Sequence, residues 1–200
     1  ILFPSQISEG MKEFNSNIRL YDNEIQVKYN LQWKNVDEEI KIGLVQMLLL
    51  RLFKVKDKSQ ISYVNIDLYN HFVKQIPDFI DQTRCDPILK ESFERVNDSF
   101  FEGSMKKPNL SWGTYSTRRL ACYNYHGDLV SVSKVFKETD TDILDFLMYH
   151  ELLHKKLQFQ FSKGRSSFHS PEFKRLEKLF PGKEVVDKKI GVIIKDYLVG

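Results

Sequence analysis

The chain has 200 residues, of which 42% are hydrophobic and 28% are charged, and its net charge is +3 at pH 7. This composition predicts one domain or slightly more, with a sizeable core. The small positive charge permits an acidic partner without requiring one. No apolar run of about eighteen residues is present, so we expect no membrane partner. Cys85 and Cys122 do not make a disulfide framework and fit a cytoplasmic location.

The N-terminal part of the chain is predicted to be mainly helical. Residues 24–29 alternate polar and apolar side chains, which is typical of a strand. A helix follows Asp37 and runs to about Phe53. A second helical stripe of apolar residues spans residues 60–82. We expect residues 1–85 to form a separate region that packs on the remainder of the chain.

The pattern then changes from helix to strand. Asp86 and Pro87 start a helix, and Gly103 ends it. Three short segments rich in aromatic and β-branched residues follow, at 110–115, 120–125 and 129–136. A Gly-Asp pair within residues 126–128 is typical of a hairpin turn. These segments predict a small antiparallel sheet.

The next helix, predicted from about Thr141 to Phe161, contains the pattern H-E-x-x-H as His150, Glu151 and His154. Side chains four residues apart lie on one face of a helix, so both imidazoles can reach one metal ion. Imidazole nitrogens suit zinc, and a glutamate between them can take a proton from a metal-bound water. The pattern therefore predicts a zinc site with a glutamate as general base.

Such a site needs a third protein ligand. The longer metzincin motif is excluded, because Leu157 and Gln160 stand where that motif requires glycine and histidine. His169 is favoured, since it follows a glycine-containing loop and precedes the next helix, from which it can face the motif. Glu172 and Glu177, on that next helix, are the carboxylate alternatives.

The order of these motifs resembles the SprT-like zinc metalloprotease family, which includes the Spartan proteases. Four features carry the resemblance: a helix end at 96–103, a strand beginning at 110–112, the H-E-x-x-H motif, and the segment 169–173. Ser170 departs from the family, which usually has glycine there. The chain also has no four-cysteine zinc ribbon downstream of these motifs.

The resemblance implies an α+β fold. In this fold residues 86–200 form a zincin-like catalytic unit, in which a small antiparallel sheet packs on the H-E-x-x-H helix. The mainly helical region 1–85 precedes this unit. The implied activity is that of a zinc-dependent metalloendopeptidase, a hydrolase that cleaves peptide bonds of protein or peptide substrates. We expect it to be a monomer.

The resemblance also implies particular roles for residues of the site. Three histidines would bind Zn2+: His150, His154 and His169. Glu151 would be the general base, and Phe173 would pack behind the third ligand. An extended substrate would pair with one of the strands at 110–115 and 120–125. The residue that stabilises the oxyanion is not assigned; the candidates are Tyr115, Tyr123, Tyr125, His126 and Arg165.

A second hypothesis is a DNA-associated binding protein with a metal-stabilised SprT-like fold and little or no protease activity. Basic residues lie near the motif and on the predicted sheet, and such residues can contact substrate or a phosphate backbone. The candidates are Arg118, Arg119, Lys155, Lys156 and Arg165. A solvated helix face or strand edge explains the same charges.

Overall fold

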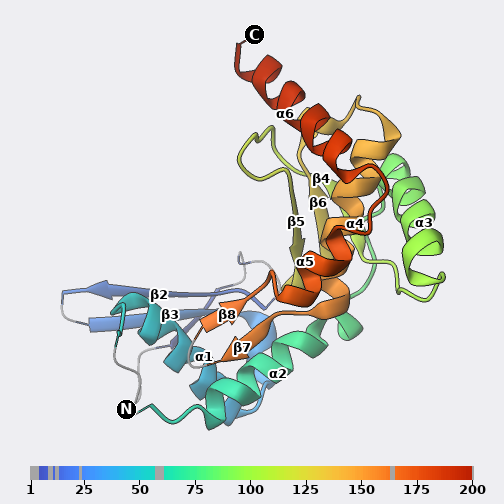
Figure 1. Cartoon of the computed structure of the whole chain (residues 1–200). Coiled ribbons are helices and arrows are strands. Elements are labelled where there is room, and N and C mark those ends of the chain that lie inside the picture. Colours follow the sequence, from blue (N-terminus) through green and yellow to red (C-terminus); the bar gives the residue numbers. More distant parts are fainter. Residues whose placement is uncertain are drawn as a thin grey trace. The chain divides into compact units, whose positions relative to one another are not determined.

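The computed structural model describes residues 5–8, 11, 14–22, 24–56, 61–162 and 165–199. The chain divides into two compact units, residues 1–79 with 161–166, and residues 80–160 with 167–200 (Figure 1). The boundary predicted after residue 85 falls in the segment that connects the last helix of the first unit to the first helix of the second. Among the helices in the described ranges, none combines the length and apolar character that a membrane span requires.

The first unit combines two helices with a three-stranded sheet. In this sheet β3 (Glu24–Asn30) lies between β1 (Ser5–Ser8), which is parallel to it, and β2 (Ser16–Tyr21), which is antiparallel. A 3-10 helix at Leu31–Asn35 leads to α1 (Glu38–Leu52) and α2 (Val64–Phe79). The sequence predicted β3 and both helices but not β2, because β2 is exposed along most of its length and has no buried face for a period-2 pattern to mark.

The core of the first unit forms around Trp33, which is 1% exposed. Its indole contacts four other aromatic rings, those of Phe14, Tyr29, Tyr69 and Phe72. Aromatic rings bury large apolar areas, so this cluster contributes much of the unit's hydrophobic stabilisation.

The second unit begins with α3 (Pro87–Phe101), whose first backbone N–H groups are capped by the Asp86 carboxylate. A three-stranded sheet follows, formed by β4 (Asn109–Trp112), β5 (Ala121–Asn124) and β6 (Leu129–Val132). The strand order is β4-β6-β5. The prediction of a purely antiparallel sheet is wrong, since β6 pairs antiparallel with β5 but parallel with β4. The β5–β6 hairpin folds back so that β6, rather than β5, lies beside β4.

The helix that carries the motif, α4 (Thr141–Leu157), is buried along most of its length and packs against α3 and β5. It ends four residues earlier than predicted, because Gln158 adopts φ 55°. A two-stranded hairpin, β7 (Gln160–Ser162) and β8 (Arg165–Ser167), replaces the predicted helix end and loop. The chain finishes with α5 (Pro171–Glu177) and α6 (Lys183–Val199). The α+β class is therefore confirmed, with the small sheet packed on the H-E-x-x-H helix.

Candidate metal centre

Three histidines meet at the C-terminal half of α4. His150 and His154 lie one turn apart on this helix, with ring centroids separated by 5.0 Å. His169, which precedes α5, brings its ring to 5.3 Å from that of His150 and 4.8 Å from that of His154. One nitrogen from each ring lies within 4.8 Å of the others, an arrangement able to hold a metal ion. The three histidines singled out by the sequence are thus brought together.

The protonation of the α4 imidazoles fits a metal ligand. Burial lowers the pKa of His150 below its ordinary value. It lowers the pKa of His154 to about 4, with further contributions from His150 and His169. Both rings are therefore neutral near pH 7, which is the form that binds a metal. Nδ1 of His154 is also buried without a hydrogen-bond partner among the described residues. Coordination of a metal ion by this nitrogen would satisfy it.

The third histidine is held by the start of α5. Ser170 is the N-cap of this helix, and its hydroxyl oxygen accepts the backbone N–H of Phe173 at 3.1 Å. The Phe173 ring is 1% exposed. Its centroid lies 4.6–5.0 Å from the rings of all three histidines. Phe173 therefore packs behind the histidine cluster, as the sequence predicts.

Glu151 lies on the sheet side of α4 and is 5% exposed. Its Oε2 accepts a hydrogen bond from the backbone N–H of Tyr123, on β5, at 2.6 Å. Burial raises the pKa of Glu151 to about 7, although the Tyr123 N–H opposes the shift. A carboxyl group with this pKa can take up and release a proton near neutral pH.

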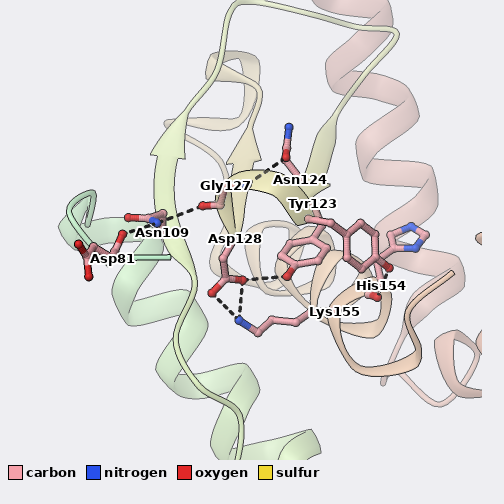
Figure 2. A network of polar contacts seen from close by, with 9 residues as sticks. Asp81, Asn109, Tyr123, Asn124, Gly127, Asp128, His154 and Lys155 are labelled. Carbon is pink, nitrogen blue, oxygen red and sulfur yellow. Dashed lines mark hydrogen bonds and ion pairs between the residues drawn. The ribbon is translucent and has the colours of Figure 1, made fainter. Parts of the chain in front are cut away.

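A buried ion pair lies beneath the site. The Asp128 carboxylate accepts hydrogen bonds from the Lys155 ammonium, at 2.6 and 2.8 Å, and from the Tyr123 hydroxyl, at 2.8 Å (Figure 2). The Asp128 side chain is fully buried. The Tyr125 hydroxyl donates to the backbone carbonyl of His154 at 2.6 Å. These contacts join β5 and the turn before β6 to the last turn of α4.

The carboxylate alternatives for the third ligand lie outside the histidine cluster. Oε1 of Glu177 is 2.7 Å from Nδ1 of His150. Glu172 is exposed in the first turn of α5. The sequence offers Glu177 as an alternative third ligand, whereas in the structure its carboxylate is hydrogen-bonded to His150.

The candidate oxyanion residues differ in their surroundings. The hydroxyls of Tyr123 and Tyr125 are both engaged, by Asp128 and by the His154 carbonyl. Tyr115 is exposed, and its ring stacks on that of Tyr197 at 6.2 Å. His126 lies in the 3-10 helix after β5. Arg165 lies on β8, and its side chain is outside the described part of the structure.

The basic residues proposed to contact substrate or nucleic acid fall into two groups. Lys155 is held by Asp128, and 13% of its side chain is exposed. Lys156 is exposed, as are Arg118 and Arg119 in the loop between β4 and β5. A contact of these three residues with nucleic acid stays a prediction, whereas the Lys155 ammonium is occupied by a structural ion pair.

The hydrogen bond from Tyr123 to Glu151 and the ion pair of Asp128 with Lys155 cannot be recognised in the sequence. A backbone N–H, such as that of Tyr123, is carried by nearly every residue type and leaves no mark in the sequence. The sequence indicates Asp128 only as part of a hairpin turn, and nothing in it relates Asp128 to Lys155.

No family model matches the sequence, and the comparison with curated proteins finds no match. Among solved structures, the chain is similar to the metallopeptidase zymogen abylysin of Pyrococcus abyssi, with 18% identity, coverage of 51% of this chain and 90% of that one, and a TM-score of 0.40. It is also similar to the metallopeptidase zymogen jannalysin of Methanocaldococcus jannaschii, with 18% identity, coverage of 58% and 95%, and a TM-score of 0.40. Similarity at this level decides neither fold nor function, so the function proposed below rests on the site itself.

Proposed function

We propose that this chain is a zinc-dependent metalloendopeptidase with a SprT-like site. The observation that carries the proposal is the convergence of His150, His154 and His169, with the buried carboxyl of Glu151 on the same helix as the first two. Three imidazole ligands together with a glutamate acid–base group are the residues of a hydrolytic zinc site. The resemblance of the motif order to SprT-like proteases agrees with this assignment.

The three histidines would bind the metal ion, and Glu151 would transfer a proton from the attacking water to the leaving amine. A zinc ion bound there would polarise the scissile carbonyl and lower the pKa of a water toward neutral. Because the Tyr123 N–H occupies Oε2 of Glu151, we assign proton uptake from the attacking water to Oε1. The same oxygen then delivers the proton to the leaving amine.

The substrate would pair with β5. This strand lies at one edge of its sheet, whereas the outer side of β4 is bridged to Cys85. Leu120 accepts the backbone N–H of Ser133 and so faces β6. In an antiparallel pair such residues alternate with residues whose N–H and C=O point outward, which here include Ala121. The Tyr123 N–H also points outward and is donated to Glu151. An extended peptide added at this edge would lie beside Glu151.

The test is Glu151→Gln in the full chain. We expect zinc content by elemental analysis to be unchanged, because Glu151 is not among the three ligands. Cleavage of an unstructured protein should fall by about 10²–10⁴-fold, the range for loss of a general base. Glu172→Gln, an exposed carboxylate on α5, is the matched control and should cleave like the wild type.

The outcome also decides between the two hypotheses. A wild-type protein that holds zinc but cleaves no unstructured protein, with or without DNA, contradicts the peptidase and favours the DNA-associated binding protein. A Glu151→Gln variant that retains full cleavage places the general base elsewhere.

A further inference from the structure

One face of α5 is turned toward the histidines. Phe173 and Glu177 are four residues apart and share this face. The first packs on the three rings, and the second brings Oε1 to 2.7 Å from Nδ1 of His150. The Glu177 and His150 side chains are only 20% and 25% exposed. The contact is therefore shielded from solvent, where a charge-assisted hydrogen bond is stronger than on an open surface.

The position of Glu177 is set by neighbouring contacts. The Tyr149 hydroxyl donates to the carbonyl of Leu176 at 2.8 Å, so the residues directly before His150 and Glu177 are bonded to each other as well. The Lys183 ammonium lies 3.9 Å from Oε2 of Glu177. Glu177 thus differs from a solvated helix charge, because α4, α5 and the start of α6 all restrain it.

We infer that Glu177 is a positioning residue for the metal ligand His150. Its carboxylate accepts the Nδ1–H of His150, which selects the tautomer whose Nε2 carries the free lone pair. That Nε2 is the nitrogen 3.4 Å from Nε2 of His169. Glu177 therefore contacts the ring at the nitrogen opposite the histidine cluster. This inference rests on the proposed metal centre and adds a residue to it.

The experiment measures the zinc dissociation constant by competition with a chromophoric chelator. We expect Glu177→Ala to weaken zinc binding by about 10–100-fold, the usual cost of removing a hydrogen-bond partner of a metal ligand. Glu177→Gln should recover part of the loss, because its amide oxygen still accepts the Nδ1–H. Glu172→Gln should bind zinc like the wild type, and His169→Ala should lose more affinity than Glu177→Ala.

A structural control separates positioning from helix docking. Tyr149→Phe removes the neighbouring bond between α4 and α5 but leaves the His150–Glu177 contact. We expect its zinc affinity to stay within a few-fold of the wild type, and the metal-free Glu177→Ala protein to keep the far-UV circular dichroism spectrum of the folded wild type. An equal loss of affinity in Tyr149→Phe would show that Glu177 acts only by docking the helices, and would overturn the inference.

The remaining outcomes are distinct. A wild type that binds zinc, with a Glu177→Ala variant of equal affinity, overturns the role of Glu177 and leaves the metal centre intact. Tight binding by His169→Ala together with loss of zinc from Glu177→Ala makes Glu177 the third ligand instead. A wild type without zinc overturns the metal centre and this inference with it.

Discussion

At the scale of single residues, Glu151 shows how burial sets a chemical property. The carboxyl group receives one short hydrogen bond, from the Tyr123 N–H, but it is 5% exposed. Loss of water disfavours the charged form more than one N–H donor favours it, and the pKa therefore rises to about 7. Ionisation of this buried carboxyl therefore lowers the free energy of unfolding.

This loss of stability predicts a pH-dependent difference between Glu151→Gln and the wild type in the absence of metal. Between pH 4.5 and 7 the folded wild type keeps a proton that the unfolded chain releases, so its stability falls as the pH rises through this range. Glutamine has no such proton. The free energy of unfolding of Glu151→Gln should therefore gain on the wild type by roughly 2 kcal/mol between pH 5 and pH 8.

Urea unfolding with a chelator present, followed by circular dichroism at both pH values, measures this difference. Glu172→Gln is the control and should show no comparable change with pH, since Glu172 is exposed. A Glu151→Gln advantage that is the same at pH 5 and pH 8 would show that the buried carboxyl is ionised throughout.

At the scale of elements, α5 is the critical short helix. It spans only Pro171–Glu177, a length that is marginal without support. Its start is defined by the Ser170 cap and by Pro171 in the first turn. Because Phe173 and Glu177 both project from it toward the histidines, the beginning of this helix determines the geometry of the site.

Ser170 offers a direct test of that role. Ser170→Ala removes the acceptor for the Phe173 N–H, and we expect it to lower the free energy of unfolding by about 1 kcal/mol. Ser170→Gly should lose only a few tenths of a kcal/mol, since glycine is tolerated at an N-cap. Urea unfolding of the two metal-free variants compares them. A Ser170→Ala variant as stable as the wild type would mean that the cap does not contribute.

At the scale of the whole molecule, two cores stabilise two units. The core of the first contains Trp33 and the contact of α1 with α2, and that of the second surrounds α4. In the first unit the helices approach closely at Gly43, where an added Cβ would lie 1.9 Å from the backbone oxygen of Asn65. Any larger residue there must separate α1 from α2.

We therefore predict opposite effects for two glycine substitutions. Gly43→Ala should lower stability by about 1–3 kcal/mol or more, because the helices are forced apart. Gly191→Ala lies on the exposed side of α6 with no atom within 4 Å of the added Cβ, and it should raise stability by roughly 0.5–1 kcal/mol. Both are measured by thermal unfolding.

Hydrogen exchange locates the effect. In Gly43→Ala, amide protection should fall in α1 and α2 while α4 keeps its protection, because the two units have separate cores. A uniform loss over both units would show that they unfold together.

Local chain geometry explains what was predictable from the sequence. The spacing of His150 and His154 places them on one face wherever that stretch is helical, and the cap at Asp86 acts within a single turn. The end of α4 is predicted four residues too late because Gln158 adopts positive φ without a glycine or proline to indicate it. Features that depend on residues close together in the chain can therefore be predicted from a single sequence.

By itself, the sequence predicted the H-E-x-x-H helix, the approach of His169 to the two motif histidines, and the α+β class. Only the tertiary structure decided that Tyr123 bonds Glu151, that Asp128 holds Lys155, and that β6 lies between β4 and β5. It also placed Glu177 on His150. The first set depends on spacing along one helix and on motif order. The second joins residues far apart in the chain, and such contacts form only when packing brings separate elements together.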